Sequence, residues 1–262
     1  MQFTLESSEG LPIRGNLEVP LHPHALVIVV HGFKGFKDWG FFPWLAETFC
    51  KQKIATCRFN MSRSGIGENP ESFERLDLFE DDTYSGQVSD LLRVVHYVRE
   101  HSSLPLFLLG HSRGGGVALL AAREVEMLRG VITWSAISHT DRWSAAEKAE
   151  WRSKGFQEVV NARTKQVMRM STRILDDVEQ HGHDILASVQ QLDVPLLAIH
   201  GVRDESVPVA ELHEIARVSH DASVMTISSA SHTYNAIHPL VHIPKELSLA
   251  ATVSEHFVNA YA

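Results

Sequence analysis

A serine flanked by glycines is the residue of this chain best suited to carry chemistry. Gly110, Ser112 and Gly114 form a G-x-S-x-G sequence that directly follows an apolar stretch and directly precedes a helix-like one. Such a strand-to-helix turn is typical of a nucleophile elbow, which holds a serine hydroxyl out of the regular backbone ladder. Glycines suit the flanking positions because side chains there would obstruct two closely approaching backbones. The spacing predicts a nucleophile at Ser112.

A serine hydroxyl needs a base within hydrogen-bond reach and an acid that orients the base. Asp204 lies just past an expected strand at 194–200, and His232 lies just past the next one at 224–228. Because the carboxyl ends of parallel strands meet at one edge of a sheet, we expect both residues beside Ser112. The alternatives are Glu205 and Asp221 for the acid, and His238 and His242 for the base.

Two backbone N–H groups must also face the oxyanion that forms during attack on a carbonyl. Arg113 follows the serine and begins the expected helix, so its N–H is one predicted donor. The other is predicted at Phe33, in the His-Gly-Phe-Lys-Gly loop at 31–35 that follows the first expected parallel strand.

Strands and helices alternate along most of the chain, which predicts a mostly parallel central sheet with helices on both faces. Strands are expected at 25–30, 54–60, 104–109, 131–137, 194–200 and 224–228, and helices at 42–52, 80–100, 113–127, 208–219 and 246–260. A hairpin of 2–8 and 12–19 should lie at one edge of the sheet. Residues 139–190 do not continue this alternation of strands and helices, and they are expected to form an insertion.

The His31-Gly32-Phe33 loop, the segment from Gly110 to Gly114, Asp204 and His232 together resemble the α/β-hydrolase superfamily. Within it, the chain is similar to bacterial carboxylesterases of the cinnamoyl/feruloyl type. The resemblance implies one domain over 1–262 with 139–190 as a lid, and no metal or organic cofactor. It also implies that a small ester is cleaved through an acyl-enzyme.

The substrate side of this resemblance is less specific than the catalytic motifs. In the esterase relatives the residue after the serine is often Gln or Met, whereas this chain has Arg113. Trp134 and His139 lie near the end of the strand after the elbow helix, and we expect them at the rim of the substrate pocket. Arg142 and other basic residues of the insertion could favour an acidic or phenolic substrate or could form a solvated face.

The same triad also suits a thioesterase, an acyltransferase or a serine peptidase, and the same fold can host a binding protein without catalysis. The composition of the chain argues against several classes of binding partner. A formal net charge of -8 argues against nucleic acid and anionic membranes, and the longest apolar run, 25–30, is too short to span a bilayer. His181 and His183 lack further metal ligands. Cys50 and Cys57 fit no metal or disulfide pattern, which favours a reducing, cytoplasmic location.

Overall fold

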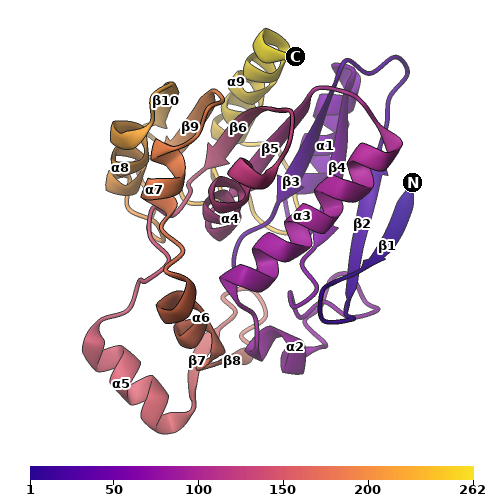
Figure 1. The fold of residues 1–262 in the computed structure, drawn as a ribbon. Coiled ribbons are helices and arrows are strands. Elements are labelled where there is room, and N and C mark those ends of the chain that lie inside the picture. Colours follow the sequence, from indigo (N-terminus) through magenta and orange to yellow (C-terminus); the bar gives the residue numbers. More distant parts are fainter.

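A computed structural model, which describes all residues 1–262, contains a central eight-stranded sheet in the order β1-β2-β4-β3-β5-β6-β9-β10 (Figure 1). Only the pairs β1–β2 and β2–β4 are antiparallel; the other five are parallel. The strands are β1 Gln2–Glu6, β2 Pro12–Glu18, β3 Ala25–Val30, β4 Ile54–Asn60, β5 Leu106–His111, β6 Leu128–Trp134, β9 Leu196–Gly201 and β10 Ala222–Ile227. The predicted parallel sheet with an edge hairpin is confirmed.

Helices cover both faces of this sheet, because its central strands are apolar on both sides. In β3, Leu26 and Ile28 pack into one buried cluster, while Val27 and Val29 pack into the other. One face carries α1 Phe42–Lys51 and α9 Lys245–Tyr261, and the other carries α3 Tyr84–His101, α4 Arg113–Ala121, α7 Ile185–Gln190 and α8 Ala210–Val218. The short helices are α2 Leu76–Glu80 and η1 Ala122–Glu124. No helix has the length and apolar character needed to cross a membrane.

The inserted segment projects from one end of the sheet (Figure 1). It consists of α5 Ala145–Lys154, an antiparallel hairpin of β7 Phe156–Val160 and β8 Val167–Ser171, and α6 Arg173–His181. The following helix α7 lies inside the predicted insertion but packs against α4 and α8 of the main body. Because α7 lies beside α8 in the body of the protein, the projecting part ends near residue 183 rather than 190 (Figure 1).

The strand after the elbow helix is displaced from its predicted position. It begins at Leu128 and ends at Trp134, whereas the sequence predicted 131–137. Ser135 has φ +48°, in the left-handed region, and therefore ends the strand. Ile137 then turns back so that its N–H donates to the Ser112 carbonyl at 3.4 Å. This turn brings the start of the inserted segment next to the predicted nucleophile.

Candidate active site

Ser112 occupies a tight turn between β5 and α4. Its backbone has φ 57° and ψ −126°, a conformation that residues with side chains rarely adopt. A Cβ on Gly110 would lie 2.3 Å from the Gly114 carbonyl oxygen, and one on Gly114 would lie 2.4 Å from that of His31. Only glycine fits at both positions, so the G-x-S-x-G sequence has the geometry expected of an elbow.

The predicted acid, Asp204, follows β9, and its carboxylate is fully buried. Oδ1 accepts the backbone N–H groups of Ser206 and Val207 at 2.9 and 2.8 Å. Oδ2 lies 2.8 Å from His232 Nδ1 and 3.2 Å from His200 Nε2. Burial alone would raise the pKa of Asp204, but the hydrogen bonds from the two histidines outweigh burial and hold the pKa well below its usual range. Asp204 is therefore ionised, whereas the alternatives Glu205 and Asp221 are exposed.

The predicted base, His232, follows β10 and is oriented from two sides. Its Nδ1 meets Asp204, and its backbone carbonyl accepts a hydrogen bond from His111 Nε2 at 2.9 Å. Burial lowers the pKa of His111 to about 3, so His111 stays neutral and carries its proton on Nε2. No hydrogen bond joins the Ser112 hydroxyl to His232. The structure thus brings the predicted acid and base together, and it makes no contact between the predicted base and Ser112.

The loop that carries the predicted oxyanion donor lies directly against the nucleophile. A Cβ on Gly32 would approach the Ser112 Cβ to 2.9 Å, so the Phe33 backbone follows immediately beside the serine. The Gly35 N–H donates to the Gly32 carbonyl at 3.0 Å and closes this loop into a tight turn. Neither the Phe33 N–H nor the Arg113 N–H donates to a backbone carbonyl, so both stay available.

Of the two residues predicted at the pocket rim, the structure contradicts Trp134. Trp134 is fully buried among core aromatics, and its Nε1 donates to the Ser254 hydroxyl of α9 at 2.9 Å. That prediction was wrong, because Trp134 points from the sheet toward α9 and cannot reach a substrate. His139 is half-exposed and its Nε2 lies 3.0 Å from Glu214 of α8, so this ring is tied to the body of the protein.

Sequence reasoning missed His200 as a neighbour of the acid. Its ring is fully buried, and Nε2 lies 2.9 Å from the Val207 carbonyl as well as 3.2 Å from Asp204. The available signal was a single histidine in the otherwise apolar stretch Leu-Leu-Ala-Ile-His-Gly of β9, a polar residue that a buried strand must satisfy.

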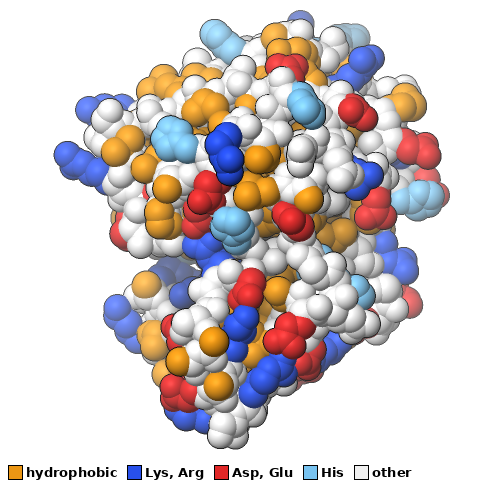
Figure 2. Space-filling model, turned by 60° about the vertical axis from the view of Figure 1, so that its left-hand side comes forward, with side chains coloured by type: hydrophobic (Ala, Val, Ile, Leu, Met, Phe, Trp, Pro, Cys, Tyr) orange, Lys and Arg blue, Asp and Glu red, His pale blue; other side chains and the backbone are white.

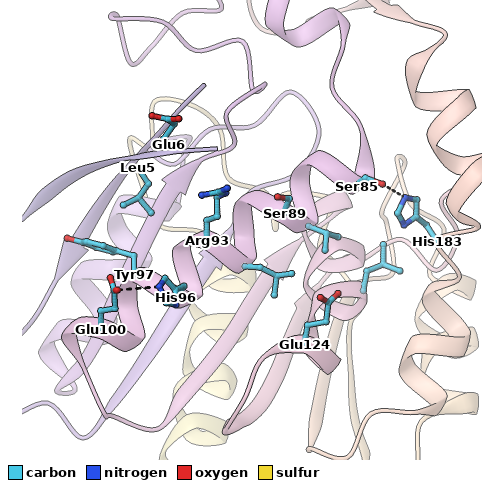
Figure 3. A pocket seen from close by; sticks show the side chains of 13 residues that line it. Leu5, Glu6, Ser85, Ser89, Arg93, His96, Tyr97, Glu100, Glu124 and His183 are labelled. Carbon is cyan, nitrogen blue, oxygen red and sulfur yellow. Dashed lines mark hydrogen bonds and ion pairs between the residues drawn. The ribbon is translucent and has the colours of Figure 1, made fainter. Parts of the chain in front are cut away.

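A large hollow of the molecule lies away from these residues. It has a volume of about 770 Å³ and runs along α3, between β1 and the start of α7 (Figure 3). Ser85 and His183 meet at one end, where His183 Nε2 lies 3.0 Å from the serine hydroxyl and 3.1 Å from Asp177. The same ring nitrogen of His183 faces both Ser85 and Asp177. In a catalytic triad one ring nitrogen of the histidine faces the serine and the other faces the acid, so these three residues do not have the arrangement of a triad.

Comparisons with known proteins identify the family of the chain. The family model described as "Serine aminopeptidase, S33" matches residues 21–236. A curated relative, 2,6-dihydropseudooxynicotine hydrolase of Paenarthrobacter nicotinovorans, is 27% identical over 211 residues, which are 77% of this chain and 50% of that protein. The chain thus spans half the length of this relative.

Solved structures share the fold over nearly the whole chain. Est1E from Butyrivibrio proteoclasticus superposes with a TM-score of 0.73 at 19% identity, over 99% of this chain and 98% of that one. Est1E has also been solved with ferulic acid bound. Mouse alpha/beta hydrolase domain-containing protein 10 gives a TM-score of 0.75 at 20% identity, with both chains fully covered. The α/β-hydrolase fold expected from the motifs is confirmed.

Proposed function

The chain belongs to the serine aminopeptidase S33 family of α/β hydrolases, and on this premise we propose that it cleaves carboxylic esters through an acyl-enzyme. The observation that carries the proposal is the buried Asp204–His232 pair, with Nδ1 2.8 Å from Oδ2, at the same sheet edge as the Ser112 elbow. An ionised carboxylate on Nδ1 fixes the tautomer in which Nε2 is free to accept a proton.

In the proposed mechanism, His232 Nε2 removes the hydroxyl proton as Ser112 Oγ attacks the ester carbonyl carbon. The Phe33 and Arg113 N–H groups stabilise the oxyanion, and Asp204 stabilises the imidazolium. The C–O bond then breaks, and His232 gives its proton to the departing alcohol. Water repeats the sequence on the acyl-enzyme, which releases the acid and restores Ser112. None of these steps calls for a metal or organic cofactor.

Charge near the nucleophile supports an ester over an aminopeptidase substrate. An aminopeptidase must hold the ammonium group of a peptide N-terminus, for which a free carboxylate is the natural partner. Glu211 is instead paired with Arg142 at 2.7 Å, and Asp82 lies 3.5 Å from Arg113 with its pKa raised by burial to about 7, so neither is a free carboxylate. The free cysteines Cys50 and Cys57 are compatible with the cytoplasmic location that we propose.

The test is the initial hydrolysis rate of p-nitrophenyl esters of increasing acyl length and of methyl ferulate, near pH 7.5. We expect turnover by the wild type and loss of at least about a thousandfold in Ser112→Ala, which keeps the fold but has no nucleophile. Matched thioester and p-nitroanilide substrates separate a thioesterase and a peptidase from an esterase. Folded wild type that cleaves none of these substrates and is not labelled by a fluorophosphonate would contradict the proposal.

A further inference from the structure

Three basic residues belong to the loops that surround the candidate site, in a chain whose formal net charge is -8. Lys34 follows the oxyanion loop residue, Arg113 follows Ser112, and Arg142 begins the inserted segment. The proximity of Arg113 lowers the pKa of Lys34 further than burial does alone. Figure 2 shows the notch between the inserted segment and the body of the protein, with Lys and Arg side chains at its inner end.

Arg113 is buried without a full set of partners. Its side chain is 9% exposed, and the guanidinium carbon lies 4.2 Å from the centre of the Phe33 ring and 5.1 Å from that of Tyr84. The two rings flank the guanidinium, which leaves its N–H edges for polar partners. The one hydrogen bond it makes in the structure is a long one, 3.5 Å from Nη1 to Asp82. A guanidinium has five donors, so most of them are unused.

Asp82 neutralises this arginine only weakly. Burial raises the pKa of Asp82 to about 7, even though Arg113 lowers it. The same Oδ2 atom also accepts a hydrogen bond from Gln87 Nε2 at 2.5 Å. Near neutral pH a substantial part of the Arg113 charge therefore lacks a counter-charge.

A second polar group close to Arg113 is poorly satisfied. The Tyr84 hydroxyl is fully buried and makes no hydrogen bond of normal geometry, and the neighbouring Arg113 guanidinium lowers its pKa against the effect of burial. The charges of both Arg113 and Arg142 act on this hydroxyl, and that of Arg142 also acts on Asp204. Arg142 is 28% exposed and is held at 2.7 Å by Glu211. Arg113 thus lies against the Tyr84 ring, and Arg142 is near enough for its charge to act on the Tyr84 hydroxyl.

We infer that Arg113, Arg142 and the Tyr84 hydroxyl form an anion subsite beside Ser112, and that the natural ester carries a carboxylate. The two oxygens of a carboxylate match the paired donors on one edge of a guanidinium, and one of them can accept the Tyr84 proton. The inference rests on the proposed ester hydrolysis, and it adds the substrate class. The arginine that distinguishes this chain from the similar esterases thereby gains a role.

The first test compares methyl hydrogen succinate, glutarate and adipate with their neutral primary-amide counterparts, which have nearly the same shape. Acid release at constant pH gives kcat/KM for each ester with the wild-type protein. Charge-assisted hydrogen bonds predict a preference of about tenfold or more for the anionic ester at one chain length. Equal or lower values for the anionic ester at every length would overturn the anion subsite.

Variants then locate the effect. We expect Arg142→Gln, Tyr84→Phe and Arg113→Met each to lower the anionic-to-neutral ratio at least about threefold, whatever they do to the absolute rates. The control is Arg152→Gln, which removes the same charge from an exposed arginine of the inserted segment that pairs with Asp176 and Glu179. A similar loss of preference in this control would attribute the effect to general steering and would contradict the subsite.

A measurement on the wild type alone covers the case of a variant that fails to fold. Free glutarate should inhibit hydrolysis of methyl butyrate competitively and at least about tenfold more strongly than glutaramide. The two proposals fail differently. No hydrolysis of any ester contradicts the proposed function, whereas hydrolysis of neutral and anionic esters at equal rates, with equal inhibition, contradicts only the anion subsite.

Discussion

Two regions of the molecule differ in how far their charged side chains are buried. One is the edge of the sheet at which the parallel strands end, and the other is the inserted segment. At the edge, the Asp204 carboxylate is fully buried and surrounded by two backbone N–H groups and two histidines. In the inserted segment, Arg152 and Asp176 lie 2.7 Å apart with side chains 38% and 58% exposed. Exposed pairs of this kind contribute about 0–1 kcal/mol. Charged contacts therefore hold the side chains in place at the edge of the sheet, whereas they contribute little to the stability of the inserted segment.

The inserted segment depends instead on an apolar face that continues the core of the main body. Trp151 of α5 is buried, and its Nε1 donates to the Met170 carbonyl of β8 at 2.9 Å. Met168, Ile174 and Leu175 belong to the same buried cluster as the strands of the sheet. This shared core therefore holds the inserted segment against the main body.

The sharpest test of the contrast is to neutralise one carboxylate in each region. Asp204→Asn should lower kcat on p-nitrophenyl acetate by about 10³–10⁴-fold, because an amide can hold His232 in the wrong tautomer. Asp176→Asn, in the inserted segment, should change kcat less than about twofold. Circular dichroism checks that both variants are folded. Similar activity losses in the two would remove the distinction between the regions.

The chemistry of the edge was predictable because short motifs carry it. The glycines at 110 and 114 are required by backbone contacts of 2.3–2.4 Å, so the elbow can be recognised without knowing the rest of the fold. Asp204 and His232 follow from strand order, because parallel strands end at one edge.

What the sequence could not supply is the direction in which a strand-end side chain points. Trp134 does lie at the end of its strand, but its side chain points to the face of the sheet that α9 covers, which its position in the sequence does not reveal. The helix at 185–190 was missed because six residues are too few for a periodic pattern, and its place is decided by packing against α4 and α8.

A second comparison concerns stability at the junction of the two regions. Glu211 of α8 accepts the Ser138 N–H and an Arg142 N–H, both at 2.7 Å, just before the inserted segment begins. Glu211→Ala should lower the free energy of unfolding by about 3 kcal/mol, because a buried N–H and a partly buried guanidinium lose their partner. Arg152→Ala should cost under about 1 kcal/mol. Urea unfolding measures the loss of unfolding free energy in each variant. Equal losses would contradict the claim that the hydrogen bonds of Glu211 stabilise the junction between the main body and the inserted segment.

The pH dependence of stability should also separate a buried carboxylate from an exposed one. Burial raises the pKa of Asp82 to about 7 in the folded protein, above the value of about 3.9 expected in the unfolded chain. The folded state holds this proton more tightly, so the stability that Asp82 contributes is lost as the pH rises through about 7.

Relative to Asp82→Asn, the wild type should therefore lose about 2 kcal/mol of unfolding free energy between pH 5 and pH 8. The measurement is urea unfolding of both proteins at several pH values. The matched change Asp176→Asn removes an exposed carboxylate and should show no such trend. A wild type that gains stability over the Asn variant as the pH rises would show that the Arg113 pair, and not burial, dominates at Asp82.

The smallest expected effect on activity concerns His200, which adds one hydrogen-bond donor beside the carboxylate of Asp204. The carbonyl oxygen of Val207 can only accept, so His200 Nε2 carries a proton that also faces Asp204 Oδ2 at 3.2 Å. His200→Met removes this donor, whereas His200→Gln can keep one on its amide. The carboxylate of the Met variant would attract the proton of His232 more strongly, which raises the pKa of the base. Of the other groups beside His232, His111 is neutral and unchanged by the substitution.

We therefore expect His200→Met to lower kcat about tenfold, with KM nearly unchanged, and to move the acidic limb of the kcat profile to higher pH. His200→Gln should retain most of the activity and the wild-type profile. The exposed His181 of the inserted segment provides the matched control, since His181→Met should leave both quantities unchanged. If the Met and Gln variants at residue 200 lose the same activity without a shift of the profile, His200 serves packing alone, and the carboxylate needs only its backbone donors and His232.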